Sequence, residues 1–161
     1  MVLGSNEVRL IDMTRAFAAV SAQGQAVEPY GIVKIATTDG RVLYQHQAKG
    51  GVALVSPNVA KGMTDLLQSA VATGTGSAAQ IGRPVAGKTG TTTSNKDGWF
   101  LGFSSGVTTG VWMGRDDDKP VPGLQGGTAP ASIQTPPVVG CTGSGRPSRV
   151  AGQRPAGRSP A

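Results

Sequence analysis

The chain of 161 residues is poor in the side chains that bind metals and form disulfides. Its one cysteine, Cys141, cannot form a disulfide within the chain, and its one histidine, His46, lies far from that cysteine in the sequence. The two residues therefore indicate neither a zinc site nor a thiol–histidine catalytic centre. We expect no metal and no other cofactor.

Long hydrophobic runs are also absent. No stretch approaches the roughly 20 apolar residues that cross a bilayer. The stretch from Met1 to Met13 contains charged residues where an export signal needs an apolar core. The sequence as written therefore predicts no export signal, no membrane segment and a cytoplasmic location.

The net charge of +6 does not indicate nucleic acid binding, because the basic residues do not cluster with aromatic residues on a predicted helix or strand. Four arginines lie instead within residues 132–161, a stretch rich in proline, glycine and serine. This composition is typical of a disordered tail. We divide the chain into an ordered part, residues 1–131, and this tail. A non-catalytic basic module whose tail binds an anionic polymer remains one alternative.

Two amphipathic helices are predicted in the ordered part. The first is capped near Ser5 and stops at Gly24, and the second starts at Ser56-Pro57 and stops at Gly74. In both, apolar residues recur at intervals of three and four, which places them on one helix face. These residues are Leu10, Met13, Phe17 and Val20 in the first helix and Val59, Met63, Leu66, Leu67 and Val71 in the second.

Five β-rich runs separated by turn residues predict strands. The first two runs form a β-hairpin and the last three an antiparallel meander, so we expect an α+β fold with helices on the faces of an antiparallel sheet. Turns are expected from Asn95 to Gly98 and at Ser105-Gly106. The apolar residues expected in the core are Phe100, Leu101, Phe103, Val111, Trp112 and Met113. The five runs are residues 31–37, 41–45, 85–92, 99–104 and 108–113.

One segment matches two chemical signatures. Gly82 to Thr89 fits the phosphate-loop pattern G-x-x-x-x-G-K-[ST], and Lys88-Thr89-Gly90 fits the K-T-G motif of penicillin-interacting enzymes. A phosphate loop needs a helix that begins at its Lys-Thr pair, whereas the glycine and threonines that follow disfavour a helix. A nucleotide-binding protein is nevertheless the second alternative.

The K-T-G motif needs a strand. There Lys88 and Gly90 lie on one side, and the side chains of Thr89 and Thr91 lie on the other. Gly90 permits close approach of a ligand backbone, the threonine hydroxyls can donate to a carboxylate, and Lys88 supplies positive charge near a serine nucleophile. On these four residues alone, an ordinary solvated edge strand fits equally well.

The blocks that follow the motif identify a family. Arg83 to Thr92 is followed by Asp97 to Phe103 and by Gly110 to Asp116. Together with the predicted order of helix, hairpin and helix, these blocks resemble the carboxy-terminal part of the transpeptidase domain of class A penicillin-binding proteins. The resemblance covers about residues 2–131. It implies the penicillin-binding/β-lactamase-like transpeptidase fold, of which the chain would contain roughly the last half.

In that family, a serine of an S-x-x-K motif attacks the D-alanyl-D-alanine end of a peptidoglycan stem peptide and passes the acyl group to an amine of a neighbouring peptide. β-Lactams acylate the same serine. The resemblance thus implies stem peptides and β-lactams as partners and a periplasmic domain anchored in the inner membrane. It implies that Lys88 orders the hydroxyl network, that Thr89, Gly90 and Thr91 bind the substrate, and that the Thr91 amide is half of an oxyanion hole.

The nucleophile motif is missing from the sequence. No serine is followed by a lysine three positions later, and Ser56-Pro57-Asn58, which has the letters S-x-N, lies at a predicted helix start after the hairpin rather than before the first helix. A K-T-G strand positions a substrate but does not attack it. We therefore expect a transpeptidase fragment that is inactive alone.

Overall fold

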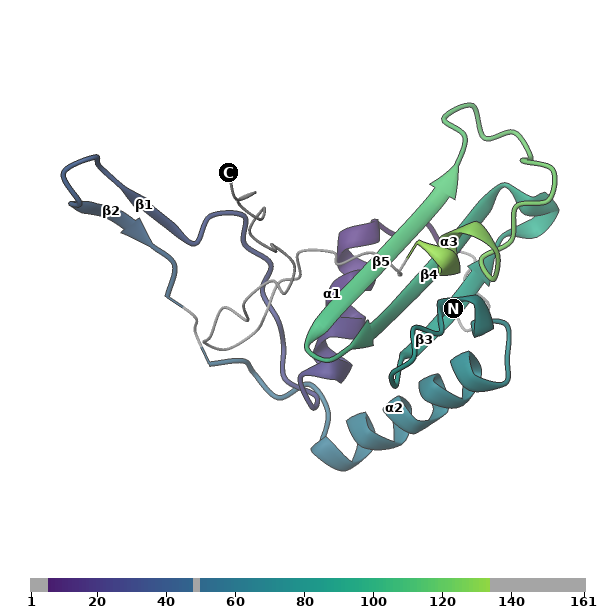
Figure 1. Cartoon of the computed structure of the whole chain (residues 1–161), viewed down its shortest axis with the longest axis horizontal. Helices are drawn as coiled ribbons and strands as arrows, with labels where there is room; N and C mark the ends of the chain where they lie inside the picture. The colour runs from purple at the N-terminus through teal and green to yellow at the C-terminus, as the bar shows by residue number, and fades with distance from the viewer. Residues whose placement is uncertain (1–5, 48–49, 134–161) are drawn as a thin grey trace, which may run out of the picture.

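The computed structural model describes residues 6–47 and 50–133. It confirms the α+β fold and the order of helix, hairpin, helix and three-stranded sheet (Figure 1). No helix in these two ranges is long and apolar enough to span a membrane. The elements are α1 (Leu10–Ser21), β1 (Lys34–Ala36), β2 (Val42–Gln45), α2 (Pro57–Ala72), η1 (Ser77–Ala79), β3 (Ala86–Thr91), η2 (Thr93–Asn95), β4 (Asp97–Ser104), β5 (Val107–Gly114) and α3 (Ala129–Ser132).

The central sheet is an antiparallel meander with β4 in the middle and β3 at one edge. Its second connection is the predicted Ser105-Gly106 turn, where both residues have positive φ, as a tight two-residue hairpin requires. The predicted turn from Asn95 to Gly98 is wrong at its end, because β4 already begins at Asp97. The chain reverses earlier, where Ser94 and Asn95 adopt positive φ.

Helices cover both faces of this sheet. On one face, α1 lies so close to β5 that a Cβ at Gly110 would clash with the side chains of Thr14 and Leu10. On the other face, a side chain at Gly98 would meet Leu124 and Pro130, the latter from α3. Helix α2 packs beside β3 (Figure 1). The glycines of the sheet therefore allow helix and strand backbones to approach closely.

The core lies between these elements in two apolar clusters. Phe100 of β4 is fully buried and packs in a cluster with residues of α2, η1 and α3. Phe103 belongs to a second cluster on the opposite face, with residues of α2, β3 and α1. The expected core role of Trp112 is wrong: 39% of this residue is exposed, and its indole N–H donates to Asp97 Oδ1 at 2.9 Å.

The predicted start of the second helix is confirmed, whereas that of the first is wrong. Ser56 caps α2 through a bond from the Val59 amide, as the Ser-Pro pair predicts. Helix α1 begins later than expected, with Arg9 as a cap residue that makes no side-chain capping bond. Ser5, the predicted cap, lies outside the described residues, as does most of the predicted tail.

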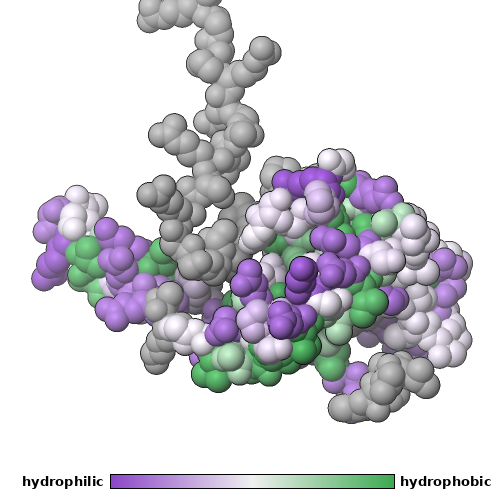
Figure 2. All heavy atoms as spheres, turned by 90° about the horizontal axis from the view of Figure 1, so that it is seen from below, coloured by the Kyte–Doolittle hydropathy of each residue, from purple (hydrophilic) through white to green (hydrophobic). Residues whose placement is uncertain are grey.

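Helix α2 buries only part of its predicted apolar face. Leu67 and Val71 are buried together with Ala60, whereas three other predicted core residues are exposed. Figure 2 views the molecule from the side of α2 and shows hydrophobic surface there. The exposed residues are Val59, Met63 and Leu66, which follow one another at helical spacing.

The β1–β2 hairpin projects away from the sheet (Figure 1). Its strands pair antiparallel with each other, and every residue of both strands is exposed. At its base, the rings of Tyr30 and His46 stack with centroids 3.6 Å apart. The hairpin thus makes its contacts within itself and adds nothing to the core around Phe100.

Substitution of Phe100 tests this assignment of the core. Phe100→Ala is expected to lower the free energy of unfolding by about 3–5 kcal/mol, because it leaves a cavity in a fully buried position. Leu66→Ala on α2 is the control, and we expect a change within about 0.5 kcal/mol because Leu66 is 69% exposed. Urea denaturation of the chain, followed by circular dichroism, measures both. Equal effects of the two substitutions would contradict the assignment.

Candidate functional site

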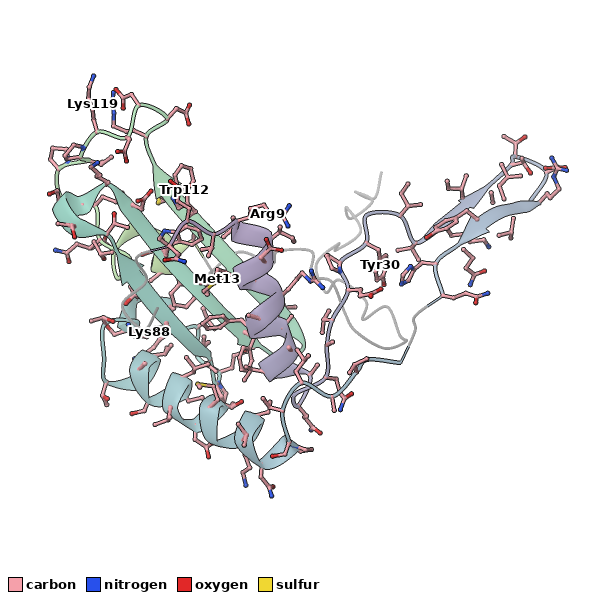
Figure 3. All side chains as sticks on the ribbon, turned by 180° about the vertical axis from the view of Figure 1, so that it is seen from behind. Arg9, Met13, Tyr30, Lys88, Trp112 and Lys119 are labelled. Carbon is pink, nitrogen blue, oxygen red and sulfur yellow. The ribbon has the colours of Figure 1, made fainter. Side chains whose placement is uncertain are left out.

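The K-T-G residues lie on β3, the edge strand of the sheet. The strand is buried at its start, where Ala86 and Gly87 pack against the core, and becomes accessible from Lys88 onward. Lys88 and Thr91 are exposed, whereas Thr89 and Gly90 are half-buried. Figure 3 shows Lys88 on the strand that borders α2, with Trp112 across the sheet on β5. One end of the strand is thus anchored, and the other is accessible to a ligand.

The backbone of β3 has a free edge at these residues. The Thr92 amide donates to the carbonyl of Asp97 on the facing strand. Because amides alternate in direction along an antiparallel strand, the Gly90 amide also faces β4, and those of Thr89 and Thr91 point away from it. Lys88 Nζ donates to the Thr89 carbonyl at 2.9 Å, which brings the ammonium to the same edge. A cation and two backbone donors therefore meet there.

The two threonine side chains are held on the opposite face from Lys88. Thr89 Oγ1 shares a hydrogen bond of 2.5 Å with Oγ1 of Thr75, which follows α2. Thr91 Oγ1 accepts the backbone N–H of Gly126 at 3.0 Å. The structure thus places the side chains on alternate faces, as the strand period predicts. It also brings in two contact residues, Thr75 and Gly126, that the sequence analysis did not single out.

A third residue missed by the sequence analysis, Asp97, fixes the end of the motif. Its Oδ2 accepts the hydroxyl of Thr92 at 3.0 Å, and its own amide donates back to that hydroxyl oxygen at 2.8 Å. Its Oδ1 accepts the indole N–H of Trp112. The carboxylate therefore ties the turn after β3 to β5. Asp97 opens one of the blocks that follow the motif, but nothing in the sequence predicts these partners.

The geometry does not fit a phosphate loop. Gly87, Lys88 and Thr89 all lie within β3 and pair with residues of β4. A phosphate loop requires these three residues at the start of a helix, where consecutive amides and the helix dipole bind phosphates. The nucleotide-binding alternative therefore lacks its structural basis. The tail of the other alternative, a basic binding module, lies almost entirely outside the described residues.

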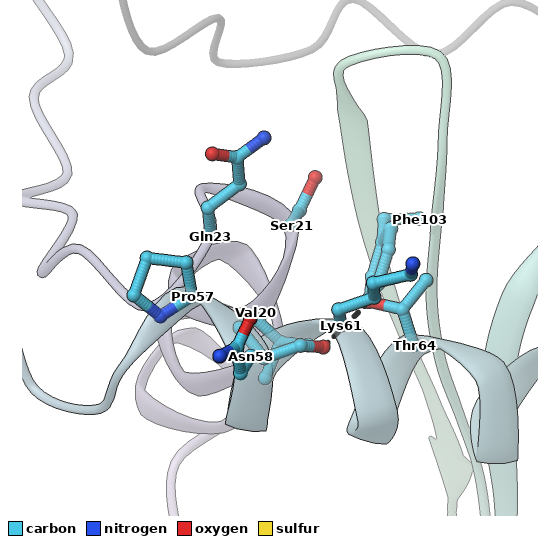
Figure 4. A pocket seen from close by; sticks show the side chains of 9 residues that line it. Val20, Ser21, Gln23, Pro57, Asn58, Lys61, Thr64 and Phe103 are labelled. Atoms are coloured by element: carbon cyan, nitrogen blue, oxygen red, sulfur yellow. Dashed lines mark hydrogen bonds between the residues drawn. The ribbon is translucent and has the colours of Figure 1, made fainter.

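One pocket is found away from the motif, between the end of α1 and the start of α2 (Figure 4). Its volume is about 370 Å³, and Phe103 forms part of its wall. It contains neither Lys88 nor Thr91, so the pocket and the candidate site are separate. The other lining residues are Val20, Ser21, Gln23, Pro57, Asn58, Ala60, Lys61 and Thr64.

The acidic run after β5 forms ion pairs. Arg115 contacts Asp117 through Nε at 2.7 Å, and Lys119 Nζ contacts the same carboxylate at 3.1 Å. Asp118 pairs with Lys96 Nζ at 2.5 Å. The hydrogen bond from Arg115, followed by that from Lys119, lowers the pKa of Asp117 from 3.8 to about 2. These carboxylates point to lysines and an arginine, so the run forms a charged exit from the strand.

Comparison with known proteins gives one family. A model of the "Penicillin binding protein transpeptidase domain" matches residues 4–115. Two curated relatives are called penicillin-binding protein 1A. The one from Aquifex aeolicus is 37% identical over 120 residues, and the one from Neisseria cinerea is 37% identical over 125 residues. Each match covers 74% of this chain but only 16% of the relative, so the chain spans less than a fifth of their length.

Solved structures show the same likeness. The penicillin-binding protein PonA1 from Mycobacterium tuberculosis superposes with a TM-score of 0.69 and 31% identity, over 82% of this chain and 38% of that one. Penicillin-binding protein 1A from Haemophilus influenzae gives a TM-score of 0.71 and 26% identity, over 79% of this chain and 25% of that one. The fold described above is therefore part of a larger known fold.

The ion pairs of Asp117 predict how this carboxyl titrates. Because its pKa is lowered in the folded state, the contact with Arg115 stabilises the fold above about pH 3.8, and that contribution is lost as the pH falls to about 2. Arg115→Gln is expected to raise the pKa of Asp117 toward its ordinary value of 3.8. NMR titration of the side-chain carboxyl carbon measures this shift. Arg83→Gln is the control, and an unchanged pKa in Arg115→Gln would refute the assignment.

Proposed function

Because the chain belongs to the penicillin binding protein transpeptidase domain family, we propose that it supplies the K-T-G strand of a serine D,D-transpeptidase that cross-links peptidoglycan. One observation carries the proposal. The ammonium of Lys88 and the free amides of Thr89 and Thr91 lie together at the accessible edge of β3. An extended peptide with a terminal carboxylate can pair with such an edge.

The proposed reaction is acyl transfer in two steps. A serine oxygen attacks the carbonyl carbon of the penultimate D-alanine, and the terminal D-alanine leaves as a free amine after it takes up a proton. An amine of a second stem peptide then attacks the acyl-enzyme, which forms the cross-link and releases the serine. Each step passes through an oxyanion, which backbone amides can stabilise. The reaction takes place where peptidoglycan is, outside the cytoplasmic membrane.

Each K-T-G residue has a role that its geometry supports. Lys88 carries a positive charge to the edge of β3, where it attracts the terminal carboxylate of the stem peptide and orders nearby hydroxyls. The Thr91 amide is directed away from β4 and is available to an oxyanion. The hydroxyls of Thr89 and Thr91 donate to the carboxylate, and Gly90 lets the substrate backbone approach closely.

The nucleophile comes from a different segment in this proposal, because no S-x-x-K motif occurs in the 161 residues. The relatives are several times longer than the matched region. A protein of their length therefore has enough further sequence to contain an S-x-x-K segment. β-Lactams are proposed as inhibitors that acylate the same serine. A structure of PonA1 that resembles this chain, with 30% identity and a TM-score of 0.69, is described as a complex with penicillin V.

Labelling with a fluorescent penicillin tests the proposal. We expect no covalent label on the 161-residue chain, because it has no S-x-x-K serine. A version extended upstream to include such a segment is expected to be labelled, with the adduct on that serine by mass spectrometry. In the extended protein, Lys88→Ala should slow acylation by about tenfold or more, the usual effect of losing a hydrogen bond to a charged group such as the terminal carboxylate.

Lys34→Ala is the matched control for that substitution, because Lys34 lies on the projecting hairpin. It removes the same charge and should leave the acylation rate unchanged. Two results would refute the proposal: a folded extended protein that is not labelled, or equal rates for Lys88→Ala and Lys34→Ala. Labelling of the short chain would instead show that one of its own serines is the nucleophile.

A further inference from the structure

We propose that the turn from Gln125 to Thr128, together with Thr75, positions the threonine hydroxyls of the K-T-G strand from behind, so that both donate their protons to the substrate carboxylate. Gly126 and Thr75 are positioning residues in this proposal, because they act through Thr91 and Thr89. The inference rests on the proposed function of this strand. It adds residues from two other parts of the chain to the site.

Gly126 lies directly against the sheet. It is buried, and its amide donates to Thr91 Oγ1 at 3.0 Å. A Cβ at this position would overlap the carbonyl oxygens of Gly90 and Trp99, which belong to paired residues of β3 and β4. These are backbone atoms of a sheet and cannot move aside cheaply. Only a residue without a side chain therefore brings its amide within reach of Thr91.

This contact sets the direction of the Thr91 hydroxyl. A hydroxyl has one proton to donate and two lone pairs that accept. The Gly126 amide can only donate, so it occupies a lone pair and cannot take the proton. No other described residue accepts the Thr91 proton through a bond that the structure shows. Thr91 is exposed, and its proton is therefore available to an acceptor that arrives from outside, such as a carboxylate.

The same turn also supports the second threonine. Gly127 follows Gly126 and lies so close to Thr75 that a Cβ there would be 2.5 Å from the Thr75 carbonyl oxygen. The Thr75 hydroxyl in turn shares its hydrogen bond with Thr89. When Thr75 donates in this pair, the proton of Thr89 is free for the ligand. Gly126 thus contacts Thr91 directly, and Gly127 lies against Thr75, which contacts Thr89.

The turn is itself held in shape by Thr128. The Thr128 amide and hydroxyl both donate to the carbonyl of Gln125, at 3.0 and 2.7 Å. The Gln125 amide donates back to the Thr128 hydroxyl at 3.4 Å. The amide of Gly126 is therefore presented to Thr91 by a turn that its own hydrogen bonds close.

The test measures preference for a carboxylate in the upstream-extended protein. Its readout is the ratio of the acylation rate constants for penicillin V and for penicillin V methyl ester, which lacks the charge. Thr91→Val, Gly126→Ala and Thr75→Val are each expected to reduce this ratio roughly tenfold, which is typical for loss of a hydrogen bond to a charged group. Thr75→Ser retains a hydroxyl and should restore the ratio.

Two controls separate positioning from loss of structure. Gly31→Ala adds the same methyl group where nothing lies within 4 Å, and it should leave the ratio unchanged. The double variant Gly126→Ala/Thr91→Val should have the same ratio as Thr91→Val, because Gly126 acts through the hydroxyl that is already absent. If the two substitutions instead reduced the ratio by the product of their separate effects, Gly126 would act independently of Thr91. That result would overturn the proposal.

If Gly126→Ala does not fold, Thr75→Val tests the inference in its place. Thr75 is exposed and valine has the shape of threonine, so we expect this variant to fold. An unchanged ratio in folded Thr75→Val overturns the inference while the proposed function stands. Absence of labelling in the unsubstituted protein overturns the proposed function and the inference with it. A reduced ratio that Thr75→Ser restores supports the inference.

Discussion

The site depends on the register in which β3 pairs with β4. Gly90 faces Trp99, and Ala86 faces Phe103. A slip of one residue would move every side chain of β3 to the other face of the sheet. Lys88 would then point toward Thr75, and the threonines would lose their partners. Burial of Ala86 at one end and the bonds between Asp97 and Thr92 at the other hold this register.

This arrangement divides the strand into two parts with different tasks. The first residues, Ala86 and Gly87, are buried and connect the strand to the core around Phe100 and Phe103. The following residues keep one backbone edge free, and a free edge invites pairing with another strand unless it is short or charged. The structure exposes that edge over a short stretch only, beside a lysine. A short, charged edge resists pairing with another sheet, and in the proposed function it pairs with an extended peptide.

Local patterns in the sequence predict the elements well. The Ser-Pro pair at Ser56, the turn at Ser105-Gly106 and the strand around Lys88 all appear where expected. Contacts between distant segments could not be predicted in this way. The partners of Thr89 and Thr91 come from positions 75 and 126, and nothing in the spacing of those residues links them to the motif. The exposure of Trp112 has the same cause, because its partner Asp97 becomes a neighbour only once β5 has paired with β4.

The projecting hairpin has a consequence for how the chain loses its structure. Because both of its strands are exposed and pair only with each other, separating them disrupts no contact of the sheet. Local opening at such a place costs far less free energy than global unfolding. The amides of β1 and β2 should therefore exchange with deuterium much faster than those of β4. For the same reason, a change in the length of the loop at Gly40 should leave the stability of the sheet unchanged.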